Sequence, residues 1–486
     1  MSSNYKLGKL TTPLVINRYT SNSTRNITLV GAGLTGCLLA IYLAKRGFHV
    51  DIYEGRPDLR KTKIGGGRSI NLTLAARGIQ ALKEVGLYDQ VMQLTIPLKG
   101  RIIHALNGNR IFQPYGYNDS EVLYSLLRNE LSILLLNELE KYKTVQVYFN
   151  QKCTGISFEQ RELYLQNQTT KEQTTVKVNQ IIGTDGSASA IRTAMQTKVG
   201  FNFSQAYLDH GYKEITIPAY QSSLPVLERN ALHVWPRKQY MINGFPNQDG
   251  SMTCVLFAPF EGENGLNNLN SEKKVLNLFQ TQFPDILSFI PDLAQRYFSS
   301  KTGHLVTIKC QPWHVEDKAL LLGDAAHAIV PFHGQGMNCA FEDCAYLDKC
   351  IEKHGTDWQS VFQEFERYRK VNTDAIADLS IQNYLELRDH VADSRFSLKK
   401  KVEEILADKY PEQFIPRFSM VCFHQFPYSI AQHRGAIQQS ILEEICQNIN
   451  DVEDINWEKT NRLIEEKLPQ LCLPLAPLTG TSSVAS

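Results

Sequence analysis

The feature that most constrains the fold of this chain is a glycine-rich turn between an apolar strand and an apolar helix. Residues 27–30 read as a strand, the turn Gly31-Ala32-Gly33-Leu34-Thr35-Gly36 follows, and an apolar run then leads to a second strand that ends at Glu54. Such a βαβ unit binds a dinucleotide pyrophosphate at the helix N-terminus, and an acid about 20 residues further on takes the ribose hydroxyls. The pattern predicts bound FAD or NAD, because the acid disfavours the 2′-phosphate of NADP.

A second glycine-rich stretch lies much further along the chain. The apolar residues 319–322 lead to Gly323 and Asp324, and residues 331–338, Pro-Phe-His-Gly-Gln-Gly-Met-Asn, then open a helix. A carboxylate at the carboxyl end of a strand is in the usual ligand position of an open α/β sheet. The helix N-terminus directs N–H donors at an electron-rich group. Two such loops in one chain are difficult to explain as structural turns.

Together with residues 181–186, Ile-Ile-Gly-Thr-Asp-Gly, these motifs resemble the FAD-dependent aromatic hydroxylase superfamily. The resemblance implies that Asp324 holds the ribityl chain and that the second helix faces the flavin pyrimidine. It also assigns Asp185 to a motif associated with FAD and NADPH contacts. Within the superfamily, the chain resembles the kynurenine 3-monooxygenase family over residues from about 26 to 435. The segments that carry this closer resemblance are 67–72, 99–115, 330–342 and 383–388.

The resemblance implies an NADPH-consuming monooxygenase of tryptophan catabolism that converts L-kynurenine to 3-hydroxykynurenine. FAD is the bound cofactor, NADPH and O₂ are co-substrates, and oxygen adds to the reduced flavin as a C4a-hydroperoxide. The substrate's amino group activates its own ring and the flavin carries the chemistry, so no catalytic side chain is expected. The protein must bury the reacting atoms and anchor the amino-acid end of the substrate.

The resemblance also indicates which residues contact the substrate. Arg101 can hold a carboxylate through its planar fork, and Tyr115 and Asn383 can add hydrogen bonds. Phe332 and His333 are expected above the substrate ring.

At one site position the chain departs from the family. Phe418 stands where the family pattern has a tyrosine, so one hydroxyl for the carboxylate is missing and we expect weaker substrate binding. The cofactor contacts that motif and resemblance imply are Gly31, Gly33, Leu34, Gly36, Tyr53, Glu54, Arg56, Thr73, Arg128, Cys153, Asp185, Asp324, Met337 and Asn338.

Composition excludes several other classes of function. Lysine and arginine number 51 against 50 acidic residues, so a nucleic-acid or anionic-membrane partner is not expected. The ten cysteines are scattered without a CxxC pair or zinc spacing, which predicts reduced buried thiols, no metal site and a cytoplasmic location.

The expected architecture is α/β, with a Rossmann-like FAD-binding domain of the aromatic hydroxylase type, an antiparallel substrate sheet and a helical C-terminal region. We predict a disordered leader over residues 1–25 and no membrane anchor, because the uncharged tail 468–486 contains three prolines. The FAD-binding domain is expected over 26–94, 120–200 and 300–350, and an antiparallel substrate sheet over 95–119 and 201–299. The helical region is expected over residues 351–486. The pattern of residues 122–142 predicts an amphipathic helix.

Three alternatives remain open at this stage. A hydroxylase of another aromatic acid shares the FAD motifs but not the set of Arg101, Tyr115 and Asn383, and a substrate panel would identify it. A flavin-binding interaction module, with residues 443–467 as its docking face, would bind partners without oxidising NADPH. A flavin reductase would consume NADPH anaerobically.

Overall fold

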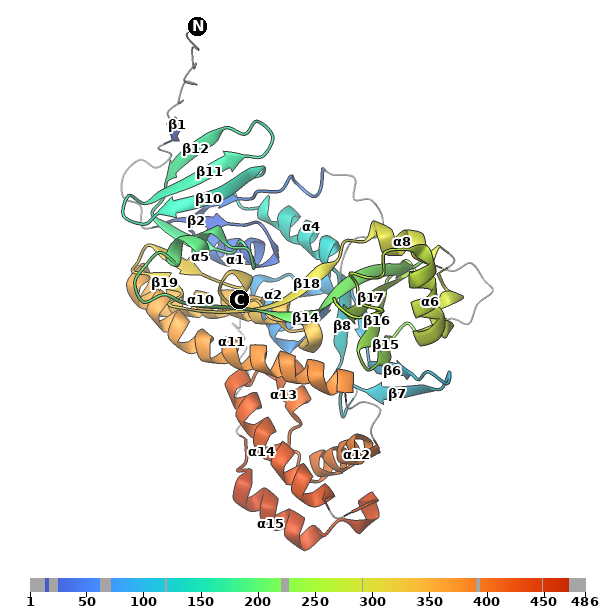
Figure 1. The fold of residues 1–486 in the computed structure, drawn as a ribbon. Helices are drawn as coiled ribbons and strands as arrows, with labels where there is room; N and C mark the ends of the chain where they lie inside the picture. Colours follow the sequence, from blue (N-terminus) through green and yellow to red (C-terminus); the bar gives the residue numbers. More distant parts are fainter. Residues whose placement is uncertain are drawn as a thin grey trace, which may run out of the picture.

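The computed structural model describes residues 14–16, 25–61, 71–118, 120–219, 227–290, 292–389, 394–447 and 449–471. A parallel sheet is built on the predicted strand–turn–helix unit (Figure 1). In spatial order its six strands are β19 (His314–Val315), β20 (Ala319–Leu321), β13 (Gln180–Gly183), β2 (Asn26–Val30), β3 (His49–Tyr53) and β9 (Val145–Tyr148). Only the edge pair β19–β20 is antiparallel. The predicted Rossmann-like fold is confirmed.

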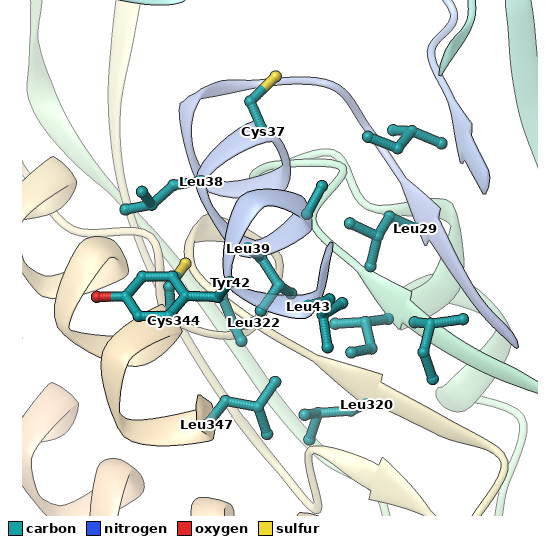
Figure 2. Packing of buried hydrophobic residues seen from close by; sticks show 14 of the residues in the cluster. Leu29, Cys37, Leu38, Leu39, Tyr42, Leu43, Leu320, Leu322, Cys344 and Leu347 are labelled. Atoms are coloured by element: carbon teal, nitrogen blue, oxygen red, sulfur yellow. The ribbon is translucent and has the colours of Figure 1, made fainter. Parts of the chain in front are cut away.

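Helix α1 (Leu34–Lys45) is buried on all sides. It packs on β2 and β3 and also contacts α4 (Arg128–Leu139) and α10 (Gly336–His354). Figure 2 shows side chains from α1, β2, α10 and the end of β20 meeting in this core. Full burial explains why the helix carries no charge before its last residue.

The register of the sheet brings three chain segments to one edge. Val30 pairs with Tyr53, and Gly183 pairs with both Val30 and Leu321. The turns that follow β2, β13 and β20 therefore lie next to one another, although they are far apart in the sequence. This is the edge at which ligands of open α/β sheets bind.

A seven-stranded sheet forms the second unit. Its spatial order is β18 (Gly303–Gln311), β14 (Asn202–Ile217), β17 (Met252–Pro259), β16 (Tyr240–Pro246), β15 (Ala231–Arg237), β6 (Gly100–His104) and β7 (Arg110–Pro114). Helices α6 (Glu272–Gln282), α7 (Pro284–Leu287) and α8 (Leu293–Ser299) share an apolar core with it. All its pairs are antiparallel except β6–β15. Because β18 pairs with β14, the sheet extends beyond the predicted boundary at residue 300.

Two smaller sheets complete the β structure. One consists of β4 (Asn71–Leu74), β8 (Leu123–Leu127) and β5 (Ile96–Leu98). The other consists of β1 (Leu14–Ile16), β12 (Gln173–Lys177), β11 (Glu162–Asn167) and β10 (Gln151–Ser157). Short helices α2 (Ala76–Val85), α3 (Tyr88–Met92) and α5 (Ala190–Met195) lie between strands.

Two sequence predictions need correction here. The helix predicted over 122–142 was wrong at its start, because residues 123–127 form β8 and the helix α4 begins at Arg128. Part of the predicted disordered leader is ordered, because Leu14–Ile16 pairs in parallel with β12. Residues 1–13 and 17–24 lie outside the described part of the chain.

The C-terminal region is helical, as predicted. Its elements are α11 (Trp358–Asp389), α12 (Ser394–Lys409), α13 (Arg417–Cys422), α14 (Tyr428–Cys446), η2 (Val452–Asp454) and α15 (Trp457–Lys467). In Figure 1, α12, α14 and α15 lie beyond α11 at one end of the molecule. They have an apolar core of their own, whereas α13 and the start of α14 pack on residues of α10 and α11.

Two observations concern the state of the cysteines and the character of the helices. The nine cysteines among the described residues are all free and buried, as predicted, and Cys472 lies outside the described part. No described helix combines the length and the apolar character needed to cross a membrane.

Candidate cofactor and substrate site

The three glycines of the first turn occupy different environments. A Cβ on Gly31, which has φ +100°, would lie 2.6 Å from the carbonyl oxygen of Thr184, and one on Gly36 would lie 2.0 Å from that of Gly31. A Cβ on Gly33 would meet nothing within 4 Å. Two glycines therefore permit close packing, and the third borders open space in front of the α1 N-terminus. That space suits a pyrophosphate held by helix N–H groups.

Glu54 follows β3 at the same edge and is ionised. It accepts hydrogen bonds from the backbone N–H of Ala32 at 2.8 Å and of Arg56 at 2.8 Å, and from Arg56 Nε at 2.9 Å. Burial alone would raise the pKa of Glu54, but Arg56 and these N–H groups hold it below its usual range. The carboxylate thus fixes the turn, and the exposed Arg56 guanidinium lies beside it.

Two aspartates stand at the neighbouring strand ends. Asp185 Oδ2 accepts from the backbone N–H of Ala190 at 2.7 Å, at the start of α5. Its Oδ1 is buried and has no partner among the described residues, and burial raises the Asp185 pKa. Asp324 begins α9 (Asp324–His327), directly after β20, and is exposed. One half-buried and one exposed carboxylate thus offer acceptors for the hydroxyl groups of a cofactor.

Other predicted cofactor residues surround this edge. Tyr53 ends β3 and stacks on Tyr148, and Leu34 is buried at the first position of α1. Cys153 of β10 is buried, and burial together with the charge of Asp185 raises its thiol pKa to about 12, so it is no nucleophile. Arg128 is the exposed first residue of α4.

Asn338, predicted to face the flavin, uses its side chain within the protein. Its Oδ1 accepts from the backbone N–H of Ala75 at 2.9 Å, and its Nδ2 donates to the carbonyl oxygens of Thr73 at 2.7 Å and Gly334 at 2.8 Å. These three bonds satisfy the amide and fix the loop that precedes α10. The first-turn N–H groups of α10, which include that of Met337, remain as donors toward a flavin.

The predicted carboxylate residues converge from separate elements. Arg101 of β6 donates from Nε to Gln113 at 2.9 Å and pairs with no carboxylate of a described residue. The Tyr115 ring stacks on Phe418 of α13, with centroids 5.5 Å apart. Burial raises the Tyr115 pKa, and the nearby charge of Arg101 opposes that shift. A half-buried guanidinium beside a protonated phenol is a suitable receptor for a small carboxylate.

The two ring-contacting residues lie in η1 (Pro331–His333). The ring of His333 stacks on Phe418 at 5.6 Å, and that of Phe332 lies 4.4 Å from Tyr384. Burial, reinforced by the charge of Arg417, lowers the His333 pKa to about 3. His333 is therefore neutral, and its Nδ1 has no partner among the described residues.

Asn383 of α11 reaches the same loop, because its Nδ2 donates to the carbonyl oxygen of Phe332 at 2.6 Å. The structure thus brings together all six predicted substrate residues. Residues 67–70 of the family-like segment 67–72 lie outside the described part of the chain.

Sequence reasoning missed several buried polar residues behind the site. Gln335 and Tyr428 are fully buried and hydrogen-bonded to each other. Arg369 and Asp343 form a buried ion pair, and Asp343 also accepts from His327 at 2.7 Å. Gln335 lies within the second glycine-rich motif, so the sequence contained a signal that this residue belongs to the site. Tyr428 lies in no motif, and nothing in the sequence pointed to it.

The chain is similar to known proteins over most of its length. Residues 24–370 match the FAD binding domain family. The chain is 43% identical over 442 residues to "Kynurenine 3-monooxygenase" of Myxococcus xanthus, covering 91% of this chain and 95% of that protein. It is 39% identical over 454 residues to the protein of the same name from Dictyostelium discoideum, covering 91% and 97%.

Solved structures show the same fold. The tetrameric form of 2-methyl-3-hydroxypyridine-5-carboxylic acid oxygenase superposes with a TM-score of 0.63 at 21% identity, over 78% of this chain and 96% of that one. PqsL of P. aeruginosa in complex with 2-aminobenzoylacetate gives a TM-score of 0.60 at 18% identity, over 75% and 96%.

Proposed function

The chain belongs to the kynurenine 3-monooxygenase family, and from this premise we propose that it hydroxylates L-kynurenine to 3-hydroxykynurenine, with FAD as cofactor and NADPH and O₂ as co-substrates. The observation that carries the proposal is the convergence of Arg101, Tyr115 and His333 at the second glycine-rich loop. Arg101 and Tyr115 suit a carboxylate, and His333 suits an aromatic ring. Kynurenine has both.

The residues at the sheet edge fit FAD. The open space at Gly33 and the α1 N-terminus suit the pyrophosphate, and the unpartnered Asp185 Oδ1 can accept from a hydroxyl group. The exposed Asp324 can accept from the ribityl chain, and the N–H groups at the α10 N-terminus can donate to the flavin. When bound, the reduced flavin supplies the activation of O₂ that ring hydroxylation requires.

The chain's own residues bind and orient the substrate. Arg101 forms a charge-assisted pair with the carboxylate, and the Tyr115 hydroxyl donates to it. Phe332 and His333 hold the ring from the side of the loop that leads into α10. Because His333 is neutral, it adds no charge that would attract water to the ring. The aromatic and aliphatic side chains around Phe332 exclude solvent from the reacting atoms.

The direct test is NADPH oxidation by the FAD-loaded protein with and without L-kynurenine, with the mass of the product measured. We expect kynurenine to accelerate oxidation and to gain one oxygen atom. Peroxide release without an oxygenated product would overturn the proposal. Stronger stimulation by a hydroxybenzoate in the same assay would indicate a hydroxylase of another aromatic acid.

A variant pair tests the carboxylate site. Arg101→Ala removes the inferred guanidinium–carboxylate pair, and we expect the KM for kynurenine to rise by at least about a hundredfold, since charged hydrogen bonds are the strong ones. The matched control is Arg110→Ala, at an exposed position on the next strand of the same hairpin, which should keep wild-type kinetics. Both variants should stay yellow; loss of flavin from Arg101→Ala alone would place Arg101 at the cofactor instead.

We also propose a cytoplasmic location, which the buried free cysteines support. Fractionation of cells that express the native protein would test it, and recovery with the membrane fraction would contradict it.

A further inference from the structure

The loop between η1 and α10 is held through its backbone carbonyls. Those of residues 332, 333 and 334 each accept a hydrogen bond from a side-chain amide. Asn383 donates to the first at 2.6 Å, Gln335 to the second at 3.4 Å and Asn338 to the third at 2.8 Å. The loop therefore has three amide contacts, from α11, from its own end and from α10. Gly334 adopts φ +63°, so the loop turns sharply between the rings and the helix.

The middle contact depends on a residue outside the loop. The Tyr428 hydroxyl donates to Gln335 Oε1 at 2.8 Å, and both side chains are fully buried. A flipped amide would place Oε1 against the His333 carbonyl oxygen, where two acceptors would face each other. The Tyr428 donor therefore selects the amide orientation that lets Nε2 bind this carbonyl.

Tyr428 is itself held rigidly from its other side. The Arg77 guanidinium lies 3.8 Å from the centroid of its ring, and Arg77 is bonded to Glu342 at 2.7 Å and to the carbonyl oxygen of Phe426. A cation over an aromatic face in a dry interior is a strong contact. The tyrosine at the start of α14 is thus fixed between α2, α10 and the loop.

We propose that Tyr428 is a positioning residue for the hydroxylation: through Gln335 it fixes the His333 carbonyl, and with it the two rings against the substrate. This rests on the proposed function. The loop carries Phe332 and His333 at one end and at the other begins α10, whose N-terminus would hold the flavin. Arg101 holds the carboxylate from β6, a different element. A displaced loop should therefore alter the placement of the ring relative to the flavin and leave the carboxylate contact intact.

The test is Tyr428→Phe, which removes one oxygen atom and keeps the ring beneath Arg77. We expect kcat for 3-hydroxykynurenine to fall roughly tenfold and the share of NADPH electrons released as hydrogen peroxide to rise, with the KM for kynurenine within about twofold of wild type. We also expect a smaller kynurenine-induced change in the flavin absorption spectrum, a readout that needs no turnover. An unchanged spectrum and unchanged peroxide release would overturn the proposal.

Tyr42→Phe is the matched control, because the buried Tyr42 hydroxyl donates to the Ala81 carbonyl and contacts Glu84, away from the loop. It should lower the Tm without changing peroxide release or the spectrum. Equal kinetic effects of the two variants at equal loss of Tm would show a merely structural role.

A double-mutant cycle identifies the pathway. If Tyr428 acts through Gln335, then Tyr428→Phe combined with Gln335→Met should reduce kcat no more than the stronger single variant. Multiplicative losses would show that the two residues act independently and would overturn the proposal. Failure of the wild-type protein to make 3-hydroxykynurenine would instead reject the proposed function, and the spectral response would still test the loop.

Discussion

At the scale of single residues, Phe418 is the clearest departure of this chain from its family. Its ring lies between those of Tyr115 and His333 and is nearly parallel to both, at 15° and 20°. A hydroxyl added at the ring edge lies in the plane of the ring and so leaves the two stacking faces unchanged. Since a hydrogen bond to a charged group is worth about 1.5–3 kcal/mol, we predict that Phe418→Tyr lowers the KM for kynurenine roughly tenfold.

Steady-state kinetics with kynurenine as the varied substrate would check this, with kcat expected near its wild-type value. Phe423→Tyr, at a half-buried ring 6.1 Å from Phe418, serves as the control for an added hydroxyl nearby. An unchanged or raised KM in Phe418→Tyr would mean that position 418 does not face the carboxylate.

His333 gives a prediction about pH. Burial lowers its pKa from the usual 6.5 to about 3, so between these values the unfolded chain binds a proton that the folded chain does not. The stability linked to His333 is therefore complete above pH 6.5 and is lost as the pH falls toward 3. At about 1.4 kcal/mol per pH unit, the loss between pH 6.5 and 4.5 amounts to at most roughly 3 kcal/mol.

Thermal unfolding from pH 7 to 4.5 would measure it, and His333→Phe should show a shallower decrease of Tm than wild type. His433→Gln, at an exposed position on α14, is the control and should follow the wild-type curve. Parallel curves for all three proteins would contradict the burial of a neutral His333.

How far the sequence predicts single residues depends on where their partners are. The carboxylate of Glu54 could be predicted, because its partners Ala32 and Arg56 lie within or next to one βαβ unit. The bonds of Asn338 could not, because its partners at residues 73 and 75 belong to a distant strand and loop. Tyr428 is likewise 93 positions from Gln335, and no local pattern encodes such a pair.

At the scale of elements, the contact between α2 and α10 depends on one glycine. An added Cβ at Gly78 would lie 2.4 Å from Asn338 Oδ1 and 2.7 Å from Leu74 Cδ1. Alanine usually stabilises a helix interior by roughly 0.5–1 kcal/mol relative to glycine. Because Asn338 is fixed by three hydrogen bonds and cannot move aside, we predict that Gly78→Ala instead destabilises the protein by about 1–3 kcal/mol and weakens FAD binding.

Denaturant unfolding of the apoprotein and fluorescence titration with FAD would measure the two effects separately. Lys83→Ala, at an exposed position on the same helix, should change the unfolding free energy by less than about 0.5 kcal/mol and leave FAD affinity unchanged. Stabilisation by Gly78→Ala would show that α2 and α10 can separate at this point.

Elements whose hydrophobic pattern fits only one secondary structure could be predicted from the sequence, and elements whose pattern fits two could not. The strand, turn and helix over residues 26–45 are unambiguous, because the glycine-rich turn separates the apolar strand from the apolar helix. Residues 123–139 are rich in leucine throughout, which satisfies a strand and a helix equally well. The pairing of β8 with β4 and β5 decides the matter, and these partners are not adjacent in the sequence.

At the scale of the whole molecule, buried charges connect the cofactor loops with the C-terminal helices. Asp343 accepts from the Gly323 N–H at 3.2 Å and from Arg369 Nε at 2.6 Å, and Arg369 also binds Glu342 at 2.5 Å. Glu342 in turn pairs with Arg77, which lies over Tyr428. Charged residues on a helix are usually solvated, so no pattern in the sequence indicated that these side chains lie inside the protein.

The last prediction tests this connection through two arginines that pair with carboxylates of the same helix. Arg369 is 1% exposed, and Arg369→Met leaves the fully buried Asp343 without this cation and Glu342 with Arg77 alone, at a cost of about 3–5 kcal/mol. In the wild-type protein, His327 and Arg369 hold the pKa of Asp343 below its usual range. In the variant, without Arg369, burial raises that pKa. The Gly323 turn should loosen, and FAD should bind more weakly.

Arg46 provides the comparison, because it pairs with Asp348 of α10 while its side chain is 29% exposed. Arg46→Met should therefore cost less than about 1 kcal/mol and leave FAD affinity unchanged. Chemical denaturation and FAD titration of both variants would separate the two cases. Similar losses in both would mean that the buried charges do not join the cofactor loops to the helical region. This connection requires a loss of stability and FAD affinity confined to Arg369→Met. The Tm difference from wild type should shrink as the pH falls, because protonation of Asp343 then removes its uncompensated buried charge.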